Sequence, residues 1–352
     1  LLDVLGDDDV EIFTLVHVPG AVSARIEAVP IHTSFVDRLP GARARHRFYL
    51  PLFPSAVERF DLRRFDLVIS SSHCIAKGAR PPEDVPHLCY CHTPMRYIWD
   101  QYDAYFGYGH GGRALRRLAP PLTGWLRRWD VATCARVDSF VASSVFVGDR
   151  IRRCWEREAA VVNPPVDIDR FSPAVSRDEF YLIVSALVAY KRIDLAVNAF
   201  NRLGRRLVVV GDGPELPRLQ NRANANILFR GRLPDEEIAQ LMARCRAFVL
   251  PGEEDFGIAA VEAQAAGAPV IALGSGGALE TVIGAAAGHE PPPDATGVFF
   301  SSPDADALAR AVERFETLEF DPGALRASAS RFTRGRFMDR MRLQIACALH
   351  DR

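Results

Sequence analysis

Short apolar segments alternate with helical patterns along nearly the whole chain of 352 residues. Segments typical of strands cover residues 11–16, 65–72, 87–92, 138–144, 159–163, 181–187, 206–213, 226–231, 247–251, 269–274 and 297–300. Helical patterns separate the later ones, over residues 194–203, 215–223, 235–245, 257–266, 278–284 and 304–318. Because strands that alternate with helices form parallel sheets with helices on both faces, we predict an α/β fold. Ligands of such folds bind at the carboxyl ends of the strands.

The length allows roughly two domains. Residues 163–180 are rich in proline and charge and lack periodicity, which is typical of a domain boundary. We therefore predict a first domain over residues 1–170, a second over 171–330, and a terminal helix over 331–352. Residues 1–6 look like the end of a helix, and the chain does not begin with methionine. We expect the natural N-terminus, with the first strand, to be missing.

Composition excludes several classes of protein. The chain has 43 Lys+Arg against 44 Asp+Glu, and this balance argues against a general nucleic-acid binder. No apolar run approaches the roughly 20 residues of a membrane span, and no signal peptide is visible, so we expect a cytoplasmic protein. Its seven cysteines read as reduced thiols. His87, Cys89 and Cys91 would lie on one strand face and His92 on the other, which does not suit zinc; we expect no metal and no cofactor.

The segment PGEEDFGIAAVEAQAAG (251–267) follows a strand and begins a helix near Gly257. A helix N-terminus offers unpaired N–H groups to a diphosphate, and glycine lets a ligand approach the backbone. Glu254, in the loop, could accept hydrogen bonds from sugar hydroxyls, and Glu262, in the second helical turn, from a ribose. The spacing fits a nucleotide-sugar site and an ordinary loop with surface acids about equally.

Two more turns follow strands in this half. Lys191 and Arg192 lie between a strand and a helix, where they could neutralise a diphosphate. Gly211 begins the turn GDGPE, but Leu216 stands where the dinucleotide fingerprint needs glycine, which argues against a dehydrogenase. The turn GSGGALE (274–280) is a third. Three such turns at one sheet edge favour a ligand site.

These segments resemble a known family. PGEEDFGIAAVEAQAAG, LVAYKRIDLAVNAF and VVVGDGPEL resemble the donor domain of the retaining GT-B glycosyltransferases known as glycosyl transferases group 1. FDLVISSSHCIAKG, CYCHTPMRYIWDQY and NPPVDIDRF resemble a bacterial branch that builds surface polysaccharides. The resemblance covers nearly the whole chain. It implies two Rossmann-like domains that face a cleft, with the terminal helix crossing back to the first domain. The opening strand and glycine-rich turn of the family are absent here.

The resemblance also implies roles for residues of the second half. Lys191 would hold the donor diphosphate, Glu254 the sugar hydroxyls and Glu262 the ribose. The backbone that contacts phosphate and sugar would be that of Phe256, Gly257 and Ile258. Family members often have an arginine where this chain has Ala186, and Arg192 is the candidate substitute.

In the first half, the resemblance places His92 beside the reacting sugar; a structural histidine that caps its own loop is the alternative. Three residues after it suit a sugar or phosphate acceptor, or equally a packed loop: Arg96, Trp99 and Asp100. His73 and Lys77 are weaker candidates of the same kind.

Residues 111–130 combine arginines, among them Arg127 and Arg128, with leucines and Trp125. Such a segment could lie peripherally on the anionic inner face of the plasma membrane, which would suit a lipid-linked acceptor, or it could pack on the core. Pro120 and Pro121 should interrupt its helix.

The reaction that the resemblance implies is transfer of a sugar, with mannose from GDP-mannose as the leading choice, to a glycan or lipid-linked hydroxyl. Configuration would be retained, and the departing phosphate could take the acceptor proton. Catalysis would be mainly positioning and charge stabilisation, without a metal. The alternatives are a GT-B-fold sugar-nucleotide epimerase and a non-catalytic remnant that binds nucleotide-sugar.

Overall fold

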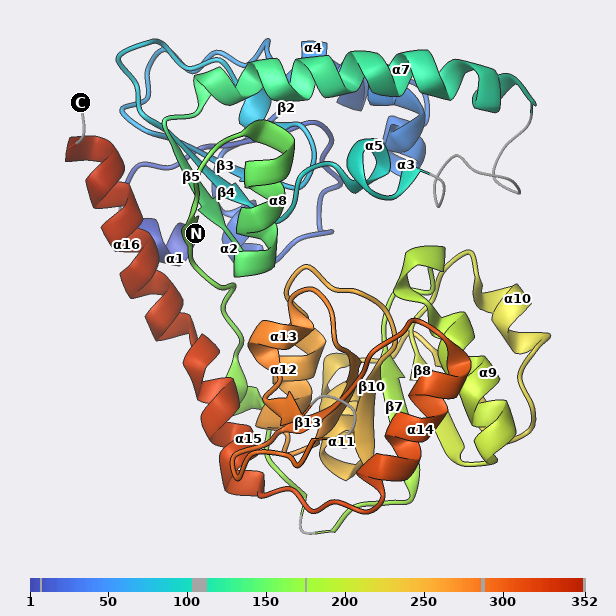
Figure 1. Ribbon diagram of the computed structural model, residues 1–352. Helices are drawn as coiled ribbons and strands as arrows, with labels where there is room; N and C mark the ends of the chain where they lie inside the picture. The colour runs from blue at the N-terminus through green and yellow to red at the C-terminus, as the bar shows by residue number, and fades with distance from the viewer. Residues whose placement is uncertain (7, 103–112, 175, 286–288, 351–352) are drawn as a thin grey trace. The chain divides into compact units, whose positions relative to one another are not determined.

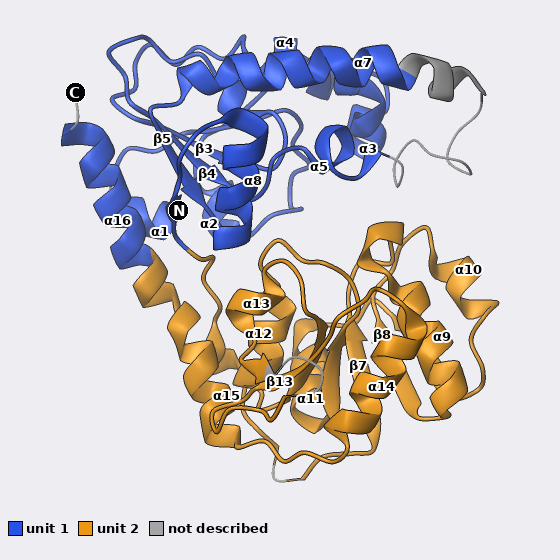
Figure 2. Cartoon of the chain, viewed as in Figure 1, with its two compact units in different colours: residues 1–162, 338–352 blue, residues 163–337 orange. Residues whose placement is uncertain are grey.

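The computed structural model describes residues 1–6, 8–102, 113–174, 176–285 and 289–350 (Figure 1), and within residues 113–118 it describes the backbone alone. The chain divides into two compact units (Figure 2), one of residues 1–162 and 338–352 and the other of residues 163–337. The boundary falls at 162/163 rather than at the predicted 170/171. The reason is that Val166, Ile168 and Phe171 lie in the core of the second unit, where the Val166 N–H donates to the Phe332 carbonyl at 2.8 Å.

The first unit contains two parallel sheets. A short one pairs β1 (Ile12–Thr14) with β2 (Ile31–Thr33). The larger sheet has the order β3-β4-β5-β6, formed by β3 (Val68–Ser72), β4 (His87–Cys91), β5 (Ser139–Ala142) and β6 (Ala160–Val161). Sequence analysis missed β2, because its three residues are exposed or half-buried and show no apolar pattern.

The helices of the first unit are mostly short. Within the described residues they are α1 (Leu2–Leu5), α2 (Ala24–Glu27), α3 (Ala42–Arg45), α4 (Phe53–Val57), α5 (Arg96–Trp99), α7 (Arg113–Ala132) and α8 (Val145–Trp155). The last helix of the chain, α16 (Arg334–His350), returns to this unit from residue 338 on. None of the helices in the described ranges is long and apolar enough to cross a membrane.

The predicted interruption of the helix at Pro120 and Pro121 is wrong. Both prolines lie inside α7, which is one helix. A proline inside a helix costs about 3 kcal/mol. Ala119 and Leu126 of this helix are fully inaccessible, and both prolines lie on its solvent side, so packing of the inner face supports the helix across them.

The second unit has one seven-stranded parallel sheet with the order β12-β13-β11-β10-β7-β8-β9. Its strands are β7 (Phe180–Val184), β8 (Arg206–Val210), β9 (Ile227–Gly231), β10 (Ala247–Leu250), β11 (Val270–Leu273), β12 (Gly284–Ala285) and β13 (Gly297–Phe300). The chain adds β8 and β9 on one side of β7 and β10 to β13 on the other. The order therefore reverses between β7 and β10, as in a doubly wound fold.

Helices cover both faces of this sheet (Figure 1). They are α9 (Ile193–Leu203), α10 (Leu216–Gln220), α11 (Asp235–Arg244), α12 (Ile258–Ala265), α13 (Ala278–Thr281), α14 (Ala305–Phe315) and α15 (Pro322–Ala329). In β7, Phe180 and Leu182 pack in the core with α11 and α12, while Tyr181 and Ile183 pack in the core with α9 and α14. Side chains thus alternate between two buried faces, which explains the continuous apolar runs. The predicted α/β fold with parallel sheets is confirmed.

Candidate functional site

Lys191 and Glu254 meet at the point where the strand order of the second unit reverses. Lys191 closes the 3-10 turn Ala189–Lys191 after β7, and Glu254 lies in the loop after β10, the neighbouring strand. The Lys191 Nζ donates to Glu254 Oε2. The two side chains are 20% and 15% exposed, so the ion pair is largely shielded but accessible from one side. Open α/β sheets bind ligands at this position.

The turn after β11 fixes the loop that contains Glu254. The Gly277 N–H donates to the Glu254 carbonyl at 2.8 Å, and Glu254 forms a parallel bridge with Gly276. Next to it, Ser275 Oγ donates to Glu253 Oε2 at 2.6 Å. The third turn that the sequence indicated, residues 274–280, therefore holds the backbone of Glu254 in place.

The same loop leads directly into α12. Gly257 precedes the helix with φ of 92°, a left-handed conformation that favours glycine. Phe256 is buried and meets the ring of Phe332 edge-on at 5.1 Å, whereas Ile258 is 44% exposed. The helix N-terminus thus opens beside Glu254, where its N–H groups can meet an anion.

Glu262 lies in the second turn of α12 and is half-buried. Burial raises the pKa of its carboxyl group above the ordinary value; Arg170 opposes the shift and Asp235 adds to it. Those two residues pair with each other at 3.2 Å. A charge pair formed by the segment before β7 and the start of α11 therefore influences the ionisation of Glu262.

Gly211 directly follows β8, where the backbone comes close to Ser185 at the end of β7. Its φ is 131°, and a Cβ at this position would approach the Ser185 carbonyl oxygen to 1.9 Å. Only glycine fits there. Arg192 also has a positive φ, of 55°, and its Nε pairs with Asp194 at 3.2 Å. The candidate substitute for the family's arginine is thus partly engaged by a neighbouring carboxylate.

In the first unit, His92 directly follows β4 and is exposed. Its ring Nε2 lies 2.8 Å from Ser71 Oγ. Its backbone N–H donates to the Ser72 carbonyl at 2.8 Å. Ser143 Oγ donates to the His92 carbonyl at 3.1 Å. The carboxyl ends of β3, β4 and β5 therefore hold this histidine with its ring accessible.

The three residues proposed for the acceptor differ in their surroundings. The Trp99 Nε1–H donates to Asp130 Oδ2 at 2.8 Å, and Asp100 pairs with the buried Arg150 of α8. Arg96 is 8% exposed. These contacts favour the packed-loop interpretation for Trp99 and Arg96, and they leave the partly exposed Asp100 as the outermost of the three.

Asp130 is a buried residue that sequence analysis did not single out. Its Oδ2 also accepts from Trp155 Nε1 at 2.7 Å, and its Oδ1 lies 3.1 Å from Lys77 Nζ. Neither Asp130 nor Lys77 is accessible. Lys77 is therefore the counter-ion of a structural network rather than a group that contacts substrate.

The segment HLCYCH is part of the sheet. His87 is inaccessible, with Nδ1 2.8 Å from the Arg136 carbonyl and Nε2 3.0 Å from Ser70 Oγ. Burial lowers the pKa of His87 to about 4, so its ring is neutral at pH 7. Nowhere in the described ranges do three His, Cys, Asp or Glu side chains gather as metal ligands would.

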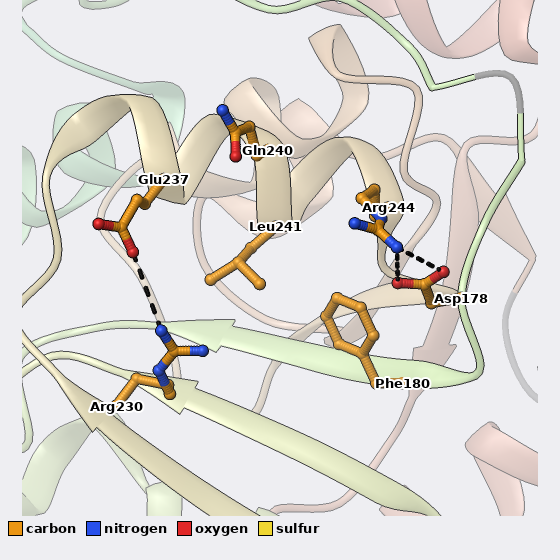
Figure 3. A pocket seen from close by; sticks show the side chains of 7 residues that line it. All are labelled: Asp178, Phe180, Arg230, Glu237, Gln240, Leu241 and Arg244. Carbon is orange, nitrogen blue, oxygen red and sulfur yellow. Dashed lines mark hydrogen bonds and ion pairs between the residues drawn. The ribbon is translucent and has the colours of Figure 1, made fainter.

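A surface pocket lies away from these residues, between α11 and strands β7 and β9 (Figure 3). Its lining is Asp178, Phe180, Arg230, Glu237, Gln240, Leu241 and Arg244. The charges are paired across it, Arg244 with Asp178 at 2.9 Å and Arg230 with Glu237 at 3.8 Å. It includes none of the predicted site residues.

Family models match both halves of the chain. The model for Glycosyl transferases group 1 matches residues 166–335, and the model for Glycosyltransferase Family 4 matches residues 6–170. Together the two matches run from residue 6 to residue 335. The second half therefore contains the group 1 glycosyltransferase domain that its motifs predicted, and the first half contains a Glycosyltransferase Family 4 domain.

Curated relatives align over part of their length. A GDP-mannose-dependent alpha-(1-6)-phosphatidylinositol monomannoside mannosyltransferase of Mycolicibacterium smegmatis is 31% identical over 235 residues, 58% of this chain and 58% of the relative. A GDP-mannose-dependent alpha-mannosyltransferase of Corynebacterium glutamicum is 38% identical over 100 residues, 28% of this chain and 24% of the relative. A glycogen synthase of Mycobacterium tuberculosis is 30% identical over 238 residues, which are 62% of this chain and 53% of the relative. The chain spans about half the length of the curated relatives it matches.

Solved structures show the fold. Sucrose-phosphate synthase from Thermosynechococcus elongatus superposes with a TM-score of 0.67 at 19% identity, over 96% of this chain and 87% of that one. Anabaena HepE in complex with UDP-glucose superposes with a TM-score of 0.63 at 17% identity, over 97% of this chain and 100% of that one. Both similarities extend over both units, and the neighbours are GT-B glycosyltransferases.

Proposed function

We propose that this chain is a glycosyltransferase that moves mannose from GDP-mannose to a hydroxyl of a glycan or lipid-linked acceptor during synthesis of a surface polysaccharide. The observation that supports this most directly is the Lys191–Glu254 pair at the switch point of the second sheet, next to the N-terminus of α12. Relatives named as GDP-mannose-dependent mannosyltransferases support the donor. The glycogen synthase among the relatives shows that similar chains are not restricted to mannose transfer.

In this proposal each group of the site contacts a different part of the donor. The Lys191 ammonium and the start of α12 hold the diphosphate, Glu254 accepts hydrogen bonds from the sugar hydroxyls, and Glu262 accepts them from the ribose. These charges stabilise the leaving diphosphate without a metal. The departing phosphate oxygen takes the acceptor proton as the acceptor oxygen bonds to the anomeric carbon, so configuration is retained and no protein nucleophile takes part. His92 is assigned to the sugar and Asp100 to the acceptor side.

We also propose a peripheral contact with an anionic membrane, which would suit a lipid-linked acceptor. On α7, Trp125 and Val131 are 40% and 44% exposed, and Arg128 lies on the solvent side between them. A second surface of the same unit combines Arg45 and Arg47 with Phe48, which is 79% exposed. Exposed aromatic rings next to arginines are typical of segments that lie on membrane surfaces. The remaining arginines of residues 111–118 lie outside the described side chains.

Thermal unfolding tests the donor site. A ligand that binds only the native state raises the melting temperature, so GDP or GDP-mannose should stabilise the chain at millimolar concentration, by ~3 °C or more, and UDP, dTDP and ADP should not. The Glu262→Ala variant should lose this shift. Glu313→Ala, on the exposed side of α14, is the matched control and should keep it. If none of the nucleotides stabilises the wild-type chain, the proposed donor site is wrong.

Product analysis separates transfer from the alternatives. A transferase consumes acceptor with the sugar, an epimerase changes the nucleotide-sugar without acceptor, and a binding remnant leaves both intact. Stabilisation by GDP-mannose with no turnover in the presence of lipid-linked acceptors would favour the remnant.

A further inference from the structure

We infer that the Lys191–Glu254 ion pair makes the site select the intact nucleotide-sugar over the free nucleoside diphosphate. The inference rests on the proposed function and concerns the same site. In the ligand-free structure these two side chains are each other's partners, since Lys191 Nζ donates to Glu254 Oε2. In the proposed complex they contact different parts of the donor. The pair must therefore separate, at least in part, when a donor binds.

Separation has a cost that depends on the ligand. A diphosphate that engages the Lys191 ammonium takes it from a carboxylate that is only 15% exposed. Shielded charges interact more strongly than charges in water, and a shielded carboxylate without a partner is destabilising. The incoming diphosphate is also negative and repels Glu254. A free nucleoside diphosphate offers this carboxylate no new hydrogen-bond donor.

An intact nucleotide-sugar does offer donors. Its sugar hydroxyls can donate to Glu254 and replace the hydrogen bond lost from Lys191. Glu254 cannot easily withdraw with its loop, because the Gly277 N–H and the bridge to Gly276 fix its backbone. The pair therefore separates by movement of the Lys191 and Glu254 side chains. The sugar compensates for the broken pair, and the diphosphate alone does not.

The neighbouring charged side chains have partners of their own, so they do not replace Lys191 or Glu254 in the pair. The Glu253 carboxylate accepts from Ser275 Oγ at 2.6 Å, and Arg192 Nε pairs with Asp194 at 3.2 Å. Once the sugar has left with the acceptor, Glu254 has lost its hydroxyl partners and the ion pair with Lys191 can re-form. This competition weakens binding of the nucleoside diphosphate product and favours its release.

The test compares GDP with GDP-mannose, with UDP and UDP-glucose in parallel, by isothermal titration calorimetry on the full chain. Glu254→Gln removes the charge with little change in shape and leaves Lys191 unpaired. We expect GDP to bind this variant more tightly than wild type, by about threefold or more, and GDP-mannose to lose its advantage over GDP. Glu253→Gln, the adjacent carboxylate in the same loop, is the matched control and should leave the ratio of the two dissociation constants within about twofold of wild type.

The outcomes separate this inference from the proposed function. If Glu254→Gln weakens GDP-mannose binding but GDP binding is unchanged or weaker, Glu254 does not compete with the diphosphate for Lys191. The inference is then wrong, and the proposed donor site is still supported. If the wild-type chain and the variant bind none of the four nucleotides, the proposed function is wrong and the inference falls with it. Should Glu254→Gln melt far below wild type, Glu254→Ala provides the second comparison. It also removes the carboxylate and should bind GDP more tightly than wild type does; GDP binding no tighter than in wild type would contradict the inference.

Discussion

Glu262 is the proposed ribose contact, and its charged form also lowers the stability of the fold. It is half-buried on α12, and burial raises its carboxyl pKa above the ordinary value of 4.5. The folded chain therefore holds this proton to higher pH than the unfolded chain does. Below the ordinary pKa both states are protonated and there is no penalty; as the pH rises through the raised pKa, the charged form destabilises the fold. A nucleotide whose ribose donates hydrogen bonds to the carboxylate would offset this penalty.

Glu262→Gln should consequently separate stability from binding. At pH 8 we expect the variant to melt higher than wild type, by ~1–3 °C, because it contains no buried charge at this position. At pH 4 the difference should disappear. GDP should stabilise the variant less than wild type at pH 8, where Glu262 is a carboxylate, and by a similar amount at pH 4, where it is protonated. Melting followed by circular dichroism from pH 4 to 8 measures this, with Glu313→Gln as control. A wild-type chain that is more stable than the variant at pH 8 would contradict the assigned penalty.

The placement of Lys191, Gly211 and Glu254 at one edge of the sheet could be predicted, because each lies in the turn or loop that follows an apolar strand. Parallel strands bring such positions to one edge. The Asp130 network could not be predicted in this way. Lys77 is 53 positions from Asp130 in sequence, and the choice between an exposed and a buried lysine depends on packing that no local pattern records. For the same reason, the sequence left Trp99 open between an acceptor contact and a packed loop, and the structure shows that its N–H donates to Asp130.

At the scale of elements, the apolar strands of both large sheets were predictable, and α7 was not. Fully buried parallel strands give short continuous apolar runs, and their length and flanking turn residues distinguish them from helices. Pro120 and Pro121 gave a strong local signal against a helix, but the interior contacts of Ala119 and Leu126 outweigh it. A prediction from local propensity fails where tertiary packing stabilises the helix by more than the prolines destabilise it.

The exposed side of α7 leads to a prediction about membranes. Vesicles of phosphatidylglycerol should bind the chain and shift its tryptophan emission to the blue, and phosphatidylcholine vesicles should not. Binding should weaken with salt, because exposed charges are screened. Trp125→Ala and Arg128→Glu should each weaken binding severalfold, since each arginine near such a surface contributes about 1 kcal/mol. Leu228→Ala, an exposed leucine of β9 in the other unit, is the control.

If binding survives both α7 substitutions, the surface of Arg45, Arg47 and Phe48 is the remaining candidate, and Arg47→Glu tests it. Equal binding to anionic and neutral vesicles by all of these variants would show that the membrane contact is wrong.

At the scale of the molecule, the residues assigned to the nucleotide all lie between 163 and 337, whereas His92, assigned to the sugar, and Asp100, assigned to the acceptor, lie in the other unit. Each unit has its own hydrophobic clusters. The boundary near residue 163 was predictable from its prolines and charges, but its position was not. The core contacts of Val166 and Phe171 extend the second unit toward the N-terminus. Because two units with separate cores need not unfold together, the nucleotide should raise the melting temperature of the transition in which residues 163–337 unfold.

Hydrogen exchange can therefore locate the donor site within the whole chain. GDP should slow amide exchange around Lys191 and along residues 251–265, since it stabilises only conformations in which these segments are folded. Residues 87–100 of the first unit should exchange at the same rate with and without GDP, because no group assigned to the nucleotide belongs to that unit. Glu262→Ala should abolish the protection, and Glu313→Ala should preserve it. Protection of residues 87–100 by GDP alone would mean that the nucleotide orders the first unit too, and the donor site could not then be assigned to residues 163–337 only.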